Sequence, residues 1–357
     1  MHRSLLALCA AGACVPSAWA QGAVSISGVM DLAARHVRNE SVGSITSLVS
    51  GSNATSRVIV SGREDLGGGL GAGFHLEHGL LADTGTQATA DKFWDRRSTL
   101  SLFSPSFGEL RLGRDFVPTY TNWTRYDPFA YVGVARSANF ISATPNGPIR
   151  SAFGSNANTT VRSDNGVQLL LPGGLGGLEG ALMLAPGEGG AVASGLAKLA
   201  AVRLGYAART WSVSAATAQS ENSQTGGDRF KDTAVGGTFD VANVRLSGAW
   251  RTFRHGQAKQ SLLLVGAVAS FGPHELKASW LKADLEGRVG ATAIDANDAT
   301  QVGLGYVYNL SKRTALYGTF AQISNDGAAR YVITDGPPGM PDGGTSRGIE
   351  FGVRHRF

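Results

Sequence analysis

The chain has 357 residues, of which 43% are hydrophobic and 17% charged, and its 32 basic and 27 acidic side chains give a formal net charge of +5. Its longest strongly apolar stretch, residues 5–18, is shorter than the roughly 20 residues of a spanning helix, which excludes a helical membrane protein. With 49 glycines, 12 prolines and no Gly-X-Y period, the sequence is also unlike collagen and unlike a proline-rich disordered chain.

Residues 1–20 have the three parts of a signal peptide. A basic start precedes a short apolar run, and Ala18-Trp19-Ala20 forms a small-x-small cleavage site, so the mature chain is expected to begin at Gln21. Both cysteines, Cys9 and Cys14, lie in this segment, so no disulfide and no cysteine-based metal or redox site is expected in the mature chain. A lipoprotein attached through Cys14 is the alternative, although the usual leucine is missing.

The charge of the mature chain is modest. Cleavage removes one basic residue, Arg3, and no acidic one, which leaves 31 basic against 27 acidic residues and a net charge of +4. The basic residues are spread along the chain instead of forming a patch, and a nucleic-acid partner is therefore not expected.

From its first to its last segment the mature chain has a period of two. Near the beginning, the apolar Val24, Ile26 and Met30 alternate with a more polar set that includes Asp31. This spacing predicts a half-buried strand and not a helix. The last segment, residues 346–357, repeats the alternation with charged residues on its second face, which indicates that this face is wet.

Short turns and long polar loops alternate along the chain and delimit the strands. Sixteen strands are predicted, at residues 23–36, 55–65, 70–81, 93–103, 107–114, 158–171, 177–186, 197–207, 211–219, 232–240, 244–253, 259–270, 274–284, 299–309, 314–324 and 346–357. Most are close to the 9–11 residues that cross a bilayer at a tilt, and an even number closes an antiparallel sheet. The prediction is an all-β fold, a 16-stranded antiparallel transmembrane β-barrel around an aqueous channel.

Five segments carry a family resemblance: residues 24–31, 56–70, 74–79, 107–115 and 352–357. On these segments, in this order and spacing, the chain resembles the trimeric general porins of Gram-negative outer membranes, in the branch best known from β-proteobacteria and neisserial-type bacteria. The resemblance implies short periplasmic turns, long extracellular loops and a single barrel domain, residues 21–357. It also implies that the third loop, residues 115–157, folds into the lumen as a constriction.

The resemblance further implies where the protein works and what it contacts. The expected location is the outer membrane of a Gram-negative bacterium, as a homotrimer that contacts outer-membrane lipid and lipopolysaccharide and conducts ions and small hydrophilic solutes. The terminal Phe357, on an alternating strand, resembles the signal that the outer-membrane barrel assembly machinery recognises. No cofactor is implied.

In the family, arginines on the barrel wall face the third loop across the lumen. Two arginines of this chain match that pattern residue by residue: Arg57 and Arg114. Two others are inferred only from their inward position in the alternation: Arg97 and Arg35. The strand after the loop supplies a further candidate, Arg162, with Arg150 as its competitor.

The charge of the third loop predicts the selectivity of the channel. Between residues 116 and 163 the only acid is Asp127, whereas four residues are arginine: Arg125, Arg136, Arg150 and Arg162. Cation-preferring porins place carboxylates on this loop, and rings of arginine favour anions. The hypothesis is therefore a weakly to moderately anion-selective diffusion pore.

Other patterns in the sequence point to other kinds of site. The glycine-rich residues 67–73 precede a strand and not a helix, which argues against a dinucleotide site. His75, Glu77 and His78 are metal-ligand types, but His78 lies on the opposite face of the strand from the other two, so no metal site is expected. No nucleophile with its base stands out, so no enzyme is predicted. Two alternatives stay open: a substrate-selective anion channel of the same fold, and a barrel that only anchors a surface or adhesion protein.

Overall fold

The computed structural model describes residues 24–141, 146–154, 160–187 and 197–357. The expected signal peptide, residues 1–20, lies outside these residues. Nineteen strands are described, and all of them belong to one antiparallel sheet and its small extensions. No helix in the described ranges is long and apolar enough to cross a membrane.

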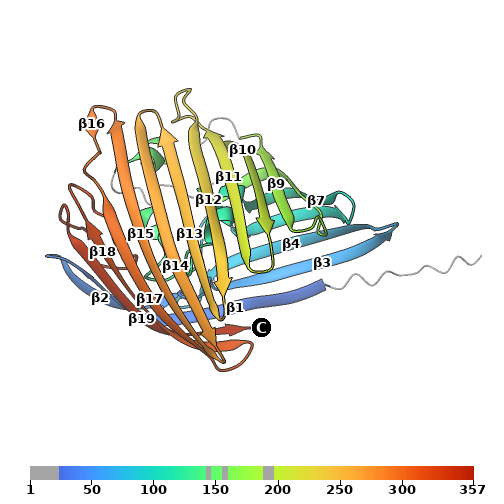
Figure 1. Ribbon diagram of the computed structural model, residues 1–357, viewed down its shortest axis with the longest axis horizontal. Coiled ribbons are helices and arrows are strands. Elements are labelled where there is room, and N and C mark those ends of the chain that lie inside the picture. Colours follow the sequence, from blue (N-terminus) through green and yellow to red (C-terminus); the bar gives the residue numbers. More distant parts are fainter. Residues whose placement is uncertain (1–23, 142–145, 155–159, 188–196) are drawn as a thin grey trace, which may run out of the picture.

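Sixteen of the strands form a closed wall. They are β1 (Val24–Asn39), β3 (Arg57–Gly67), β4 (Leu70–Leu81), β6 (Arg97–Ser104), β7 (Gly108–Phe116), β8 (Arg162–Leu170), β9 (Leu178–Ala185), β10 (Lys198–Ala207), β11 (Trp211–Glu221), β12 (Phe230–Val241), β13 (Val244–His255), β14 (Ala258–Phe271), β15 (His274–Val289), β17 (Ala299–Asn309), β18 (Thr314–Asn325) and β19 (Thr345–Arg356). Each pairs with its neighbour along the chain, and β1 also pairs with β19. In Figure 1 the blue and red strands therefore lie side by side. The predicted 16-stranded barrel is confirmed, and closure leaves no unpaired sheet edge in the wall.

The remaining three strands are extensions of loops. β2 (Gly43–Ser50) pairs with the part of β1 between Leu32 and Asn39, whereas β5 (Thr86–Gln87) and β16 (Thr292–Ala293) are two-residue ladders beside β4 and β15. The sequence predicts only a loop between the strands at residues 23–36 and 55–65, which is wrong for β2. β1 runs on to Asn39, and β2 folds back on this added length.

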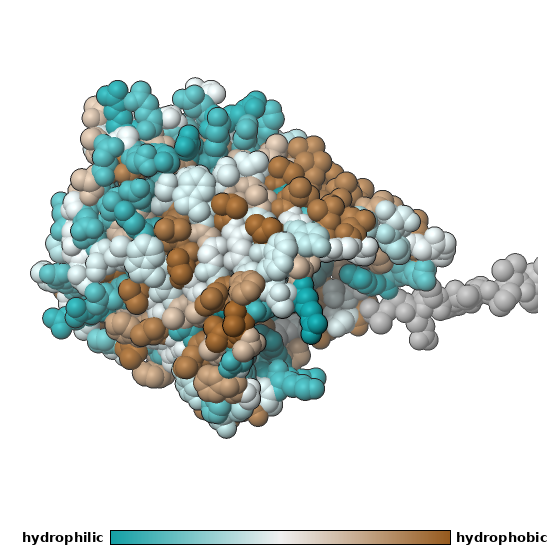
Figure 2. All heavy atoms as spheres, viewed as in Figure 1, coloured by the Kyte–Doolittle hydropathy of each residue, from teal (hydrophilic) through white to brown (hydrophobic). Residues whose placement is uncertain are grey.

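The two faces of the wall differ in chemistry. Large apolar side chains such as Leu102, Leu184 and Leu304 point outward and are exposed, as a lipid-facing surface requires. Figure 2 shows brown side chains on the wall and teal ones along the upper rim in this view. The inward face carries polar, charged and small residues, and the largest apolar cluster of the described residues lies inside the barrel, around Trp123 and Phe140.

The ring closes where the chain begins and ends. Gly28 and Phe357 exchange two backbone hydrogen bonds, at 3.0 and 3.2 Å. The Phe357 ring covers Gly28 so closely that a Cβ atom at Gly28 would lie 2.4 Å from the ring. Only a glycine allows this packing, because any larger residue would displace the terminal aromatic side chain.

Candidate channel constriction

The connection between β7 and β8 folds into the barrel, as expected for a constriction loop. It contains α1 (Pro118–Thr124), the 3₁₀ helix η1 (Ser137–Phe140) and α2 (Pro148–Phe153). Pro118 and Pro148 stand in the first helical turn, where a missing N–H costs nothing. The helices are too short for a periodic pattern, and for this reason the sequence predicted only a loop.

One buried ion pair holds the beginning and the end of this loop to the far wall. Arg251 of β13 and Asp232 of β12 pair at 2.7 Å, and their side chains are 0% and 3% exposed. Asp232 accepts a hydrogen bond of 2.6 Å from the Thr119 hydroxyl, and Arg251 donates one of 3.1 Å to the Thr160 carbonyl. We call these four residues the loop clamp. Because the pair is desolvated, its geometry is highly constrained.

The middle of the loop is held to β19 and β17. Glu350 accepts a hydrogen bond of 3.1 Å from the Val134 backbone N–H and pairs with Arg35 at 2.7 Å. Gln301 of β17 accepts from the Asn139 amide at 2.8 Å and donates to the Ala135 carbonyl at 2.9 Å. Buried polar groups of this kind cost energy unless they are paired, so each contact fixes the path of the loop.

Asp127 organises the loop from within. Its carboxylate accepts hydrogen bonds from the Ser137 hydroxyl at 2.5 Å and from the backbone N–H groups of Phe129 and Tyr131, at 2.9 and 3.2 Å. The residue is only 6% exposed. Burial raises the pKa of the Asp127 carboxyl above its usual range, although these hydrogen bonds act in the opposite direction. Asp127, the one acid predicted for the constriction, thus supports the loop, and it also lines a second cavity of about 460 Å³ together with Arg125.

A cavity of about 780 Å³ lies between the loop and the wall. Among its lining residues are four arginines and one carboxylate: Arg35, Arg96, Arg136, Arg162 and Asp335. Tyr120 and Tyr131, both from the loop region, complete one side. Burial, and then the nearby Arg35, lower the pKa of the Arg136 guanidinium. The lining of this cavity is therefore positive overall.

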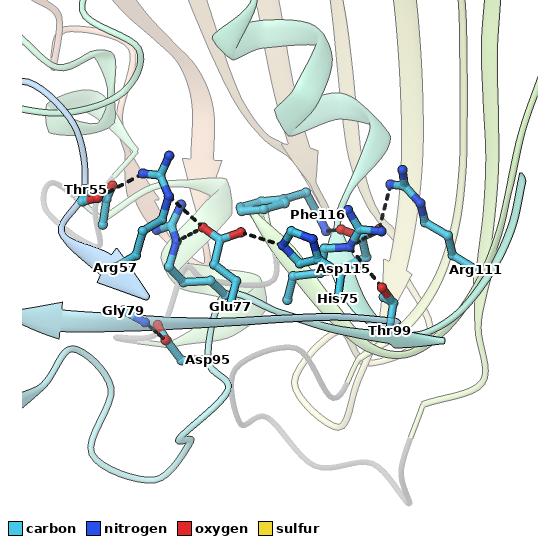
Figure 3. Close-up of polar contacts among 12 residues, drawn as sticks. Thr55, Arg57, His75, Glu77, Gly79, Asp95, Thr99, Arg111, Asp115 and Phe116 are labelled. Carbon is cyan, nitrogen blue, oxygen red and sulfur yellow. Dashed lines mark hydrogen bonds and ion pairs between the residues drawn. The ribbon is translucent and has the colours of Figure 1, made fainter. Parts of the chain in front are cut away.

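Arginines near the cavity differ in whether a carboxylate pairs with them. Arg57 and Arg96 share one carboxylate, Glu77, at 3.2 and 2.6 Å, as Figure 3 shows for Arg57. Arg162 instead lies over the Phe116 ring, 4.9 Å from its centre, and its Nε has no hydrogen-bond partner. No ion pair joins Arg162 to a carboxylate among the described residues.

A second group of charges lies beside the first on the same wall. Arg111 pairs with Glu109 at 2.7 Å and with Asp115 at 3.1 Å, and Arg97 lies 3.8 and 3.7 Å from the same two acids. Figure 3 shows Arg111 and Asp115 facing each other next to Thr99. Two basic and two acidic groups balance here, so the net positive charge belongs to the 780 Å³ cavity.

Comparison with known proteins agrees with this architecture. Residues 4–328 match the family model described as Gram-negative porin. The chain belongs to the Gram-negative porin family. It is an outer-membrane porin, and the prediction of family, barrel and location is confirmed.

Several relatives of this porin cover nearly the whole chain. The outer membrane porin protein 32 of Delftia acidovorans is 32% identical, over 100% of both chains. An outer membrane porin protein of Bordetella pertussis is 25% identical, over 87% of this chain and 84% of its own. The solved structure titled anion-selective porin from Comamonas acidovorans is 31% identical with a TM-score of 0.78, over 94% of this chain and 100% of its own.

The porin structure brings together some of the predicted site residues and separates others. Arg35 and Arg162 line the cavity, and Arg57 lies beside it through Glu77. Arg97 belongs to the second, balanced group. Arg150, the competitor of Arg162, is exposed at the end of α2 and does not line the cavity.

Arg114 is placed away from the cavity. Its Nε donates to the Asp95 carbonyl at 2.6 Å, and its guanidinium pairs with Asp164, which also pairs with Lys92 at 2.5 Å. Arg114 directly precedes Asp115, whose carboxylate belongs to the second group of charges, and adjacent residues of a strand point to opposite faces, so Arg114 lies on the other face of β7. A match of residue types does not show which face of a strand a residue occupies.

The cavity also contains residues that the sequence alone does not identify as site residues. Arg96 precedes the first residue of β6, outside the regular alternation, and Asp335 lies in the last long loop. Arg136 was counted in the loop charge, but nothing in the sequence places it at the cavity.

The two histidines of β4 have different partners and do not share a site. His75 contacts Glu77 at 3.4 Å, and the His78 ring stacks on the Phe93 ring with 4.2 Å between the ring centres. The described ranges contain no cluster of three metal-ligand residues.

Proposed function

We propose that this porin is a water-filled channel for passive diffusion of ions and small hydrophilic solutes, with a preference for anions. The observation that carries the proposal is the lining of the cavity, in which four arginines face a single carboxylate. The printed description of one relative, an anion-selective porin 31% identical over its whole length, supports the same direction.

Electrostatics explains how such a lining selects anions. A narrow aqueous passage between low-dielectric walls focuses the field of fixed charges, and this field raises the local concentration of the oppositely charged ion. Rings of arginine therefore favour anions without binding them tightly. Arg162 and Arg136 contribute most to this field, since neither has an ion-pair partner among the described residues.

The proposal includes the assembly of the porin. The mature chain, residues 21–357, forms one barrel domain after removal of residues 1–20, with the constriction loop at residues 115–157. It assembles as a homotrimer among outer-membrane lipid and lipopolysaccharide. Phe357, half exposed at the end of β19 and hydrogen-bonded to Gly28, is the group that the barrel assembly machinery recognises. The porin has no enzymatic activity and no cofactor.

Planar-bilayer recording of the purified, unboiled porin in a KCl gradient tests the proposal. We expect the conductance to rise in steps. The sign of the reversal potential should show that chloride is more permeant than potassium. The preference should weaken between 0.1 and 1 M salt, because the Debye length falls from about 10 to about 3 Å.

Three results would contradict the proposal in different ways. A clear cation preference would overturn the assignment of selectivity to the arginine-lined cavity. Absence of conductance would favour a barrel that acts only as an anchor. Saturable block of the current by one anion would favour the substrate-selective channel over general diffusion.

A further inference from the structure

The last long loop, residues 326–344, enters the barrel and meets the constriction loop. The Tyr331 ring lies 4.9 Å from the Phe140 ring, and both residues accept hydrogen bonds from the Gln260 amide, at 3.1 Å through the Tyr331 hydroxyl and 2.6 Å through the Phe140 carbonyl. Thr334 and Asp335 of this loop line the 780 Å³ cavity. The cavity is therefore bounded by two loops far apart in the sequence.

The wall holds this loop on both sides of Asp335. The Ile333 backbone N–H donates to the Ser346 hydroxyl at 3.1 Å, and the Asn39 amide donates to the Pro337 carbonyl at 2.8 Å. Asp335 itself has a φ of 62°, a left-handed conformation that aspartate and asparagine adopt more readily than most residues. Its side chain is thus presented at a fixed place.

Asp335 adds a negative charge to a cavity lining that is positive overall. It pairs with Arg35 at 2.5 Å, but Arg35 already pairs with the fully buried Glu350 at 2.7 Å. The Asp335 side chain remains 46% exposed, and within the described part of the lining it is the only carboxylate. Its field therefore opposes that of Arg136 and Arg162.

We propose that Asp335 is a specificity-determining residue, whose carboxylate limits the anion preference of this porin. The inference rests on the proposed function. In that function the arginines create the anion preference, and Asp335 sets how strong it is. A fixed negative charge attracts cations into the narrow passage and lowers the local anion concentration. Removing it makes the channel more anion-selective.

The test compares the reversal potentials of Asp335→Asn and wild-type porin in the same KCl gradient. We expect the anion-to-cation permeability ratio to rise roughly fivefold, because one charge acting through water over several ångströms changes the local anion and cation concentrations roughly two- to threefold each, in opposite directions. Asparagine also tolerates a positive φ, so the loop should keep its path. Asp335→Glu keeps the charge and should keep a ratio near that of the wild type.

Asp342→Asn is the matched control. Asp342 lies in the same loop, is 52% exposed and pairs with Arg330 at 2.5 Å, but it does not line the cavity. We expect its permeability ratio to equal that of the wild type. An unchanged ratio in Asp335→Asn, or an equal rise in both asparagine variants, would overturn the inference. A preference of the wild-type channel for cations would instead contradict the proposed function. The difference in permeability ratio between Asp335→Asn and the wild type would still show the effect of Asp335.

Retention of the folded barrel is measured alongside. Unboiled samples of each variant should migrate on gels as the wild type does. If Asp335→Asn migrates as wild type and shows the higher ratio, the inference stands. If Asp335→Glu raises the ratio as much as Asp335→Asn, the change in loop shape and not the charge is responsible, and the inference fails.

Discussion

Arg162 is a clear case of a single side chain whose surroundings decide its role. It lies over Phe116, and no carboxylate among the described residues pairs with it, whereas Arg96 nearby shares Glu77 with Arg57. An arginine whose charge is not compensated keeps its full effect on passing ions, while a paired one contributes little beyond its immediate neighbours.

We expect Arg162→Gln to lower the anion-to-cation permeability ratio roughly fivefold. One unpaired charge at about 8 Å in water is worth about 0.5 kcal/mol, which changes the local anion and cation concentrations roughly two- to threefold each, in opposite directions. Reversal potentials in a KCl gradient measure the effect.

Arg114→Gln provides the comparison at the same scale. Arg114 pairs with Asp164 and donates to the Asp95 carbonyl, away from the cavity lining. We expect its permeability ratio to stay at the wild-type value. Equal losses in the two variants would show that the overall charge of the barrel, and not the cavity, controls selectivity.

At the scale of elements, the constriction loop depends on its clamp. Arg251 and Asp232 are almost completely buried, and between them they bind residues near both ends of the loop, Thr119 and Thr160. Removing one partner of a buried pair leaves the other charge uncompensated, which costs about 3–5 kcal/mol.

We predict that Arg251→Met loosens the loop and widens the passage. Single-channel conductance should rise and become noisier, and the folded band on gels should be lost at a lower temperature than in the wild type. The double variant Arg251→Met with Asp232→Leu should recover part of the thermal stability, because it leaves no buried charge alone.

Arg245→Met is the control on the same two strands. Arg245 and Asp240 join β13 and β12 at 2.8 Å, but their side chains are 60% and 33% exposed. Solvent screens surface ion pairs, which therefore contribute little to stability, so conductance and stability should stay near wild type. A similar loss in both variants would argue that the clamp has no special role.

At the scale of the whole molecule, the barrel depends on the contact between its first and last strands. β1 and β19 pair over eleven positions, from Val29 with Arg356 to Asn39 with Ser346, and Phe357 extends this contact to Gly28. In a bilayer an open edge would leave backbone groups without partners, at a cost of several kcal/mol each.

Gly28→Leu should therefore weaken closure. Its side chain would collide with the Phe357 ring, since a Cβ atom alone lies 2.4 Å away. We expect less folded porin in outer-membrane fractions and a lower temperature of unfolding, measured by the shift from the unboiled to the boiled position on gels. Gly248→Ala, on β13, is the control, because no atom lies closer than 4.0 Å to its added Cβ. If Gly248→Ala lowers both values as Gly28→Leu does, the closing contact is not special.

Much of the wall follows from the amino-acid sequence alone. Successive side chains of a strand point to opposite faces, so alternation shows locally which residues face lipid and which face the channel. This reasoning predicted the sixteen wall strands and placed Arg35 and Arg97 on the inner face. It missed β2, which forms only because β1 continues to Asn39 and gives it a partner.

The tertiary structure alone decided the composition of the constriction. The Asp127 carboxylate accepts hydrogen bonds from backbone groups of its own loop, and the Arg114 guanidinium pairs with Asp164 and does not line the cavity. Asp335 reached Arg35 across 300 residues of sequence. Such contacts leave no periodic pattern in the sequence, because they depend on how separate loops pack inside the closed barrel. The sequence by itself therefore determined a barrel with a positive loop, and only folding determined which charges face the solute.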